Sequence, residues 1–127
     1  MLRLFLDTHV VIWLFQREPS HFSKTALHLI DTCDDIFLPT ISVLELQLLY
    51  EIGRITVEPR SIIDDLQEII GLQLLNYSFK DLIFASLSVD WTRDPFDRLI
   101  VSETVLNKAK LLTKDEKILN NFSNAIW

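Results

Sequence analysis

The stretch MLRLFLDTHVVIWLF, residues 1–15, decides how the fold begins. Residues 2–6 form a short apolar run, which is typical of a strand buried on both faces of a parallel sheet. The polar residues Asp7, Thr8 and His9 interrupt this run and no small-residue cleavage site follows, so we expect no signal peptide. The run is also too short to span a bilayer. We therefore predict a buried strand at residues 2–6 and a helix at residues 8–15.

The rest of the chain alternates strand-like and helical segments. Further strands are predicted at residues 36–38, 72–76, 110–112 and 125–127. Helices are predicted at residues 23–33, 41–52, 59–70, 79–87 and 95–107, with a helical turn at 115–119. This alternation favours an α/β fold of three layers, with helices flanking a central parallel sheet of four to five strands. Because 49% of the 127 residues are hydrophobic, the chain can bury a real core, and we predict one domain spanning residues 1–127.

Two acidic residues follow predicted strands. Asp7 comes directly after the first strand, and Asp115 follows shortly after residues 110–112. In parallel sheets, binding sites form beyond the carboxyl ends of the strands. Asp7 could simply cap the next helix, because Asp accepts hydrogen bonds from free helix N–H groups, and Asp115 could simply lie at a helix start that Thr113 caps. Each could also bind a metal ion, and Thr113 could either cap the second helix or orient a ligand through its hydroxyl.

Glu45 lies on the predicted helix 41–52 at a position that calls for an explanation. A helical wheel places it within an apolar face that also contains Ile41, Leu44, Leu48, Leu49 and Ile52. A buried carboxylate is costly unless it has a cationic partner, a proton or a metal ion. Glu45 could therefore pair with a buried Arg, but we favour a functional role.

The motif DPFDRLIV, residues 94–101, places two acids three positions apart. Asp94 before Pro95 is a common way to start a helix, which makes Asp94 an N-cap residue with a possible supporting role. Asp97 then falls in the first turn, where the helix dipole favours an acid. The same placement would direct its carboxylate to the carboxyl edge of the sheet, so Asp97 could join Asp7 and Glu45 in one cluster.

Other chemistries find little support. Cys33 is the only cysteine, which excludes an intramolecular disulfide and suits a reducing cytoplasm. The chain has no nucleophile elbow, phosphate-binding loop or dinucleotide fingerprint. The net charge of −6 argues against a nucleic-acid partner, because phosphate affinity comes largely from Lys and Arg. The charge becomes −1, however, once five candidate metal ligands are set aside: Asp7, Glu45, Asp94, Asp97 and Asp115.

Together these motifs resemble the PIN-domain family, and within it the VapC-type toxins of bacterial toxin–antitoxin pairs. The matching pieces occur in the family's order and span the chain: LFLDTHVVIWL (4–14), ISVLELQLLYEIGRI (41–55), WTRDPFDRLIV (91–101) and KLLTKDEKI (110–118). The resemblance implies a parallel sheet between helices and cleavage of RNA that depends on Mg²⁺ or Mn²⁺. It also implies a small antitoxin partner, a homodimer and a cytoplasmic location.

Matched position by position, the resemblance implies that Asp7, Glu45 and Asp97 bind the metal and that Asp115 is the fourth acid. Asp94, Thr8 and Thr113 match residues that support or line the site. One departure is that Ser102 and Glu103 follow DRLIV, where the family often has small residues. Glu103 lies on a different side of the helix from Asp97, so we do not expect it to be a ligand.

The chemistry of these side chains agrees with the resemblance. Carboxylates without His or Cys suit the hard cations Mg²⁺ and Mn²⁺, and one or two ions are possible. Such an ion would relieve repulsion among the acids and activate a water for attack on a phosphodiester. Cations near the acid motifs could hold the RNA backbone or could be ordinary surface charges: Arg93, Arg98, Lys114 and Lys117.

The helix that carries Glu45 has a second apolar side, formed by Val43, Leu46 and Tyr50. A helix that is apolar on two sides is either deeply buried or covered by a partner. We predict that this second side contacts another subunit or the antitoxin.

Two other functions remain open from the sequence. A receiver-like or catalytically degenerate binding domain would keep the acids only for stability. A phosphatase could use Asp7 as its nucleophile, but that motif needs a second Asp two residues later, where this chain has His9.

Overall fold

The chain begins as the sequence predicts, with strand β1 (Arg3–Leu6) leading directly into helix α1 (Thr8–Phe15). The computed structural model describes residues 1–127. A 3₁₀ turn (Pro19–His21) and helix α2 (Lys24–Thr32) follow, and then β2 (Asp35–Phe37), α3 (Thr40–Glu51), α4 (Pro59–Ile70) and α5 (Phe79–Ser86). The last elements are α6 (Pro95–Leu106), β3 (Lys110–Leu112), α7 (Glu116–Asn121) and β4 (Ala125–Ile126). The 3₁₀ turn was not predicted.

The four strands form one parallel sheet in the order β2-β1-β3-β4, with β4 at an edge as the sequence predicts. The predicted strand at residues 72–76 is wrong, because this segment makes only an isolated bridge between Gln73 and Phe37. The Gln73 amide donates to Ile36 and its carbonyl accepts from Leu38. Since β2 has only three residues, its outer edge offers little for a further strand to pair with.

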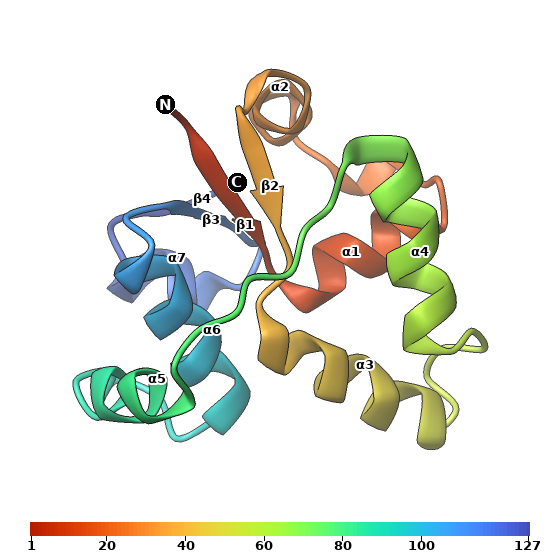
Figure 1. Ribbon diagram of the computed structural model, residues 1–127. Coiled ribbons are helices and arrows are strands. Elements are labelled where there is room, and N and C mark those ends of the chain that lie inside the picture. Colours follow the sequence, from red (N-terminus) through yellow and green to blue (C-terminus); the bar gives the residue numbers. More distant parts are fainter.

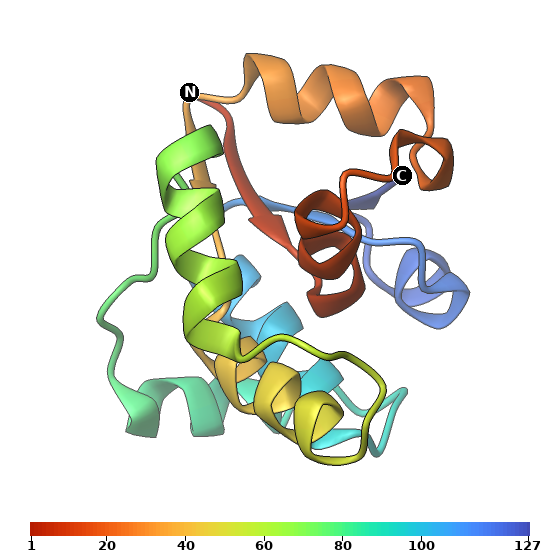
Figure 2. The same ribbon diagram turned by 90° about the vertical axis from the view of Figure 1, so that its right-hand side faces the viewer.

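Strand residues alternate between two buried hydrophobic clusters, one on each face of the sheet. Leu4, Leu6 and Leu112 pack with α1, α2 and α4, whereas Phe5 and Leu111 pack with α6 and α7. This is the alternation expected when both faces of a parallel sheet are covered. Figure 1 shows the resulting three layers, and Figure 2 views the α1, α2 and α4 layer from the front. The predicted fold class is therefore confirmed.

Helix α3 lies near the carboxyl ends of β1 and β2, at the bottom of both views (Figures 1 and 2). The prediction that Leu46 contacts a partner chain is wrong, because Leu46 is completely buried in the core of its own chain. The other two residues of that predicted surface, Val43 and Tyr50, are half-buried. The exposed apolar residues of α3 are instead Leu44, Leu48 and Ile52. Periodicity alone identifies two apolar stripes on a helix but not which of them meets the core.

Three helices begin with an aspartate whose side chain caps the first turn. Asp7 caps α1, Asp94 caps α6 and Asp115 caps α7. A cap was predicted for Asp94 and was one of two possibilities for Asp7, whereas Thr113 was the expected cap for the helix at Asp115. The capping carboxylate accepts a hydrogen bond from a free backbone N–H, which fixes the position of the acid at the start of its helix. None of the helices is both long and apolar enough to cross a membrane.

Candidate metal centre

A cleft of about 200 Å³ at the carboxyl end of the sheet brings together every acid that the sequence singled out. Its lining is Asp7, Thr8, His9, Ile12, Glu45, Leu49, Asp94, Asp97 and Asp115. The side chains come from the ends of β1 and β3 and from α1, α3 and α6. A larger groove, of about 870 Å³, lies between α3 and α4, away from these acids. The gathering of carboxylates, rather than cavity size, therefore identifies the site.

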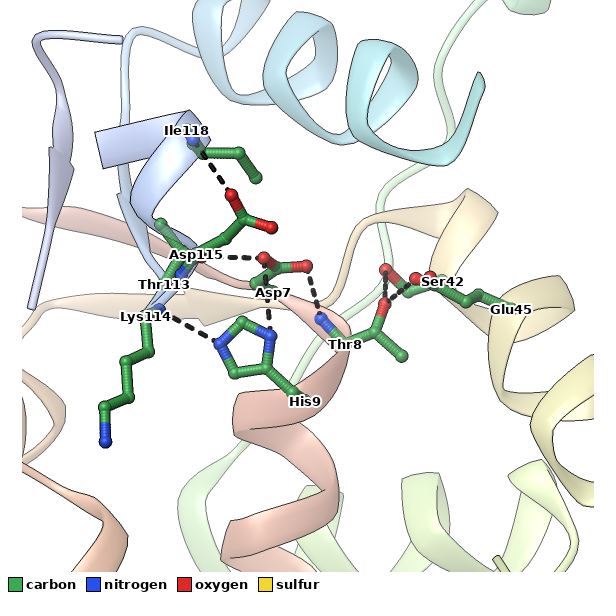
Figure 3. A network of polar contacts seen from close by, with 9 residues as sticks. All are labelled: Asp7, Thr8, His9, Ser42, Glu45, Thr113, Lys114, Asp115 and Ile118. Atoms are coloured by element: carbon green, nitrogen blue, oxygen red, sulfur yellow. Dashed lines mark hydrogen bonds and ion pairs between the residues drawn. The ribbon is translucent and has the colours of Figure 1, made fainter. Parts of the chain in front are cut away.

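Asp7 is held rigidly at the centre of this cleft (Figure 3). It is buried, and its Oδ1 accepts a hydrogen bond of 2.7 Å from the Thr8 amide. Its Oδ2 accepts a bond of 2.7 Å from the hydroxyl of Thr113, which is also buried. Thr113 in turn accepts a hydrogen bond from the Asp115 amide at 3.0 Å. Thr113 thus joins the two strand ends that carry Asp7 and Asp115. Asp7 therefore caps α1 and also belongs to the acidic cluster.

Glu45 is connected to the start of α1 through Thr8. The Thr8 hydroxyl donates a hydrogen bond to Glu45 Oε1 and lies 3.0 Å from the hydroxyl of Ser42. Because Thr8 has one hydroxyl proton, donation to Glu45 leaves its oxygen to accept from Ser42. Ser42 is fully buried and was not predicted as a site residue. The available signal was a hydroxyl three positions before Glu45, on the same side of the helix.

His9 also lines the cleft, although it was not predicted as a site residue. Its Nε2 accepts a hydrogen bond of 3.0 Å from the Lys114 backbone amide. In the neutral ring the proton is therefore on Nδ1, which lies 3.6 Å from Asp7 Oδ2. Burial lowers the pKa of His9, despite the opposing effect of Asp7 and Asp115. A neutral His9 therefore directs an N–H toward Asp7 Oδ2, the oxygen that also accepts from Thr113 (Figure 3).

Asp97 experiences the strongest electrostatic effect in the cleft. Its pKa is raised from 3.8 to about 7, first by burial and then by the negative charges of Asp94, Asp7, Asp115 and Glu45. Burial, with smaller contributions from Asp7 and Asp94, also raises the pKa of Glu45. Carboxylates that share a site repel one another, and a proton or a cation relieves this repulsion. Asp97 is thus the acid most in need of a counter-charge.

The donor set fits a hard divalent cation. All of the acids offer oxygen, the ligand that Mg²⁺ and Mn²⁺ prefer. As the side chains stand, no three of the acidic or histidine groups are close enough to hold a single ion. Mutual repulsion of the carboxylates is a sufficient physical reason for this spacing. The assignment of Asp7, Glu45, Asp97 and Asp115 as ligands stays a prediction that their convergence supports.

The cations predicted to contact RNA do not line the cleft. Arg98 is half-buried, and its guanidinium donates to the carbonyl oxygens of Thr92 and Ser86, so its role in RNA binding stays a prediction. Arg93 is exposed and donates to the Asp90 carbonyl oxygen. Lys114 and Lys117 are exposed, and the Lys114 ammonium lies 5.9 Å from the centre of the Trp13 ring. Lys114 remains the best placed of these cations, because its backbone contacts His9.

Mn²⁺ affinity is expected to depend on pH, because the metal must displace the proton that Asp97 holds below its pKa of about 7. For one proton, the apparent dissociation constant should rise about thirtyfold from pH 8 to pH 5.5 and should level off above pH 7. Isothermal titration calorimetry in buffers of different ionisation enthalpy would measure both the affinity and the protons released. The same titration with Asp97→Asn is the control, and an equally steep pH dependence in that variant would contradict the role of Asp97.

Comparison with known proteins places this chain in one family. The PIN domain family model matches residues 4–123. Ribonuclease VapC22 from Mycobacterium tuberculosis is 30% identical over 120 residues, which cover 93% of this chain and 91% of that protein.

Solved structures show the same fold at lower identity. The structure of VapBC2 from Rickettsia felis bound to a promoter DNA fragment matches with a TM-score of 0.68 and 19% identity, over 98% of this chain and 96% of that one. VapBC-1 from nontypeable Haemophilus influenzae matches with a TM-score of 0.67 and 15% identity, over 99% of this chain and 96% of that one. The family match, the relative and the shared fold together show that the chain belongs to the PIN-domain family.

Proposed function

We propose that this protein is a divalent-metal-dependent endoribonuclease and the toxin of a toxin–antitoxin pair. The observation that carries the proposal is the convergence of Asp7, Glu45, Asp94, Asp97 and Asp115 on one cleft, where the first-turn acid of α6 has a pKa of about 7. Membership of the PIN-domain family and the likeness to a relative named as a ribonuclease support this reaction.

In the proposed reaction, Asp7, Glu45, Asp97 and Asp115 would hold Mg²⁺ or Mn²⁺. A bound ion of this kind lowers the pKa of water and stabilises negative charge that develops on a phosphate. Thr8, Thr113 and His9 keep Asp7 in one orientation, so little reorganisation is needed when the substrate arrives. Without the metal, Asp97 has a pKa close to neutrality, so it would give up its proton when the ion binds.

The proposed substrate is RNA, whose backbone could enter the cleft next to Lys114. An RNA backbone brings negative charge to an acidic cleft, and this arrangement becomes favourable only with a cation present. The exposed Lys114 at the rim would attract phosphates without lowering the negative charge within the cleft.

The proposed partners are a cognate antitoxin and a second copy of the chain, in the cytoplasm. The structural neighbours from Rickettsia felis, Salmonella typhimurium and Haemophilus influenzae are VapBC proteins, which supports an antitoxin partner. Large apolar side chains are exposed on α3 and α5, among them Leu44, Ile52, Phe79 and Phe84. Exposed apolar surface of this kind favours contacts with other protein chains, so it supports a homodimer.

The direct test is cleavage of end-labelled RNA by the purified protein with Mn²⁺, with Mg²⁺ and with excess EDTA. We expect cutting only with metal, and its loss in Glu45→Gln. The exposed Glu68→Gln on α4 removes the same charge far from the cleft and serves as the matched control. Metal binding without cleavage of any RNA would favour a binding domain, and a phosphorylated Asp7 would favour a phosphatase.

A further inference from the structure

Glu103 on α6 is a buried acid outside the cleft. It is 1% exposed, and its Oε2 accepts a hydrogen bond of 2.9 Å from the backbone amide of Thr40, across 63 residues of sequence. Its other oxygen, Oε1, is buried without any hydrogen-bond partner. Burial raises the pKa of Glu103, and no neighbouring cation offsets that effect. Because an unpaired buried carboxyl oxygen is costly, its presence calls for a compensating role.

The bond from Thr40 replaces a cap that α3 lacks. Thr40 is the first residue of α3, and the preceding Pro39 makes no side-chain capping bond. The free N–H groups and positive dipole at a helix N-terminus favour an acidic acceptor. Glu103 supplies this acceptor from another helix. The Thr40 hydroxyl also donates to the Leu75 carbonyl at 3.3 Å, so the start of α3 is held from two directions.

The two helices joined by this bond carry opposite walls of the cleft. Helix α3 presents Ser42 and Glu45 within two turns of Thr40, and α6 begins with Asp94 and Asp97 two turns before Glu103. Figure 1 shows α3 and α6 as neighbouring helices, and the two are in contact. Glu103 is therefore the side chain through which the helix of Asp97 fixes the N-terminus of the helix of Glu45.

We propose that Glu103 is a positioning residue, which sets the placement of Glu45 relative to Asp97 by capping α3 from α6. This inference rests on the proposed metal-dependent function, and it adds a residue that touches neither the metal nor the substrate. Groups outside the ligand set that hold ligands in place typically change metal affinity or activity by about 10–100-fold when they are removed. Side-chain length and an acceptor oxygen matter more for this role than the charge of the side chain does.

Three variants separate positioning from simple stability. Glu103→Gln keeps an acceptor oxygen at the same reach, whereas Glu103→Met keeps the length but accepts nothing. Thr104→Val is the matched control, because Thr104 is buried in the same helix and donates only to the Ile100 carbonyl within that helix. Each protein would be compared for Mn²⁺ affinity by electron paramagnetic resonance of free Mn²⁺, for kcat and KM on one RNA, and for melting temperature.

We expect Glu103→Met to bind Mn²⁺ about tenfold more weakly and to lose kcat at saturating metal by at least as much, with KM for RNA little changed. Glu103→Gln should have a Mn²⁺ affinity and a kcat within about twofold of those of the wild type. Thr104→Val should melt at a lower temperature yet bind Mn²⁺ normally. If Glu103→Met does not fold, Glu103→Asp is used with the same expectations, because its carboxylate is one methylene too short to reach Thr40.

Normal Mn²⁺ affinity and kcat in the Met or Asp variant would overturn the inference, as would equal losses in Thr104→Val. If the wild-type protein itself neither binds Mn²⁺ nor cleaves RNA, the proposed function fails instead. These two failures are distinct, because the first is judged only against a wild type that binds the metal.

Discussion

Asp97→Asn is expected to reduce RNA cleavage at saturating Mn²⁺ by at least about a thousandfold, equivalent to about 4 kcal/mol of transition-state stabilisation. Asn keeps the size of the side chain and one oxygen, so the cleft should retain its shape. The variant lacks the negative charge that would hold a cation at the start of α6. The loss should appear mainly in kcat, because Asp97 is not expected to bind the remote parts of the RNA.

The same substitution should make the protein more stable at pH 8 when metal is absent. The pKa of Asp97 in the folded chain, about 7, lies above its value of 3.8 in a model compound. The stability that this group contributes is therefore complete at low pH and is lost as the pH rises through 7. Removal of the charge in Asp97→Asn should raise the free energy of unfolding at pH 8 by about 1–2 kcal/mol. This is less than the full pKa shift implies, because water screens a half-exposed side chain.

Urea unfolding in EDTA at pH 8 and pH 5.5 would measure this effect beside the cleavage assay. The wild type should gain stability relative to Asp97→Asn on going to pH 5.5, where its own carboxyl is protonated. Asp81→Asn removes an exposed acid from the first turn of α5 and is the control for a general charge effect. A variant that cleaves RNA normally, or that is less stable than wild type at pH 8, would show that Asp97 is a structural acid.

Three acids of the site could be predicted from sequence because each lies where one helix or strand ends and the next begins. Asp7 and Asp115 follow strands, and Asp94 precedes a proline that starts a helix, so local rules place all three at one edge of a parallel sheet. Local rules could not identify Ser42 or His9. Their contacts with Thr8 and Lys114 join residues that are far apart in the chain, and only the packed fold brings them together.

The role of Glu103 was even harder to predict from local sequence rules. The sequence correctly indicated that it differs from Asp97 in its position around α6, and it gave no reason to expect a bond to Thr40. The predicted strand at residues 72–76 was wrong for a related reason. Its apolar pattern is compatible with a strand, but pairing depends on the length of the neighbouring edge, which is a property of the assembled sheet.

Helix α3 has two apolar stripes, and their different environments lead to a prediction with a large effect on folding. Leu46→Asp should cost more than about 4 kcal/mol of folding free energy, because Leu46 is completely buried among hydrophobic residues and an unpaired charge there is very costly. Leu46→Ala should cost about 3 kcal/mol through lost burial and the cavity that remains. Urea unfolding monitored by circular dichroism at a fixed protein concentration would measure the loss of folding free energy in both variants.

Leu44 provides the matched control, since it lies on the same helix, two residues earlier, and is 50% exposed. Leu44→Asp should change the folding free energy of the monomer by no more than about 1 kcal/mol, because its side chain keeps contact with water. Size-exclusion chromatography of the same samples separates this effect from assembly, since an oligomer formed through the outer stripe would dissociate on Leu44→Asp. Equal costs at the two positions, without dissociation, would mean that α3 presents both stripes to the core. The cleft wall that carries Glu45 would then be oriented differently, because rotation of α3 about its axis moves Glu45 and Leu46 together.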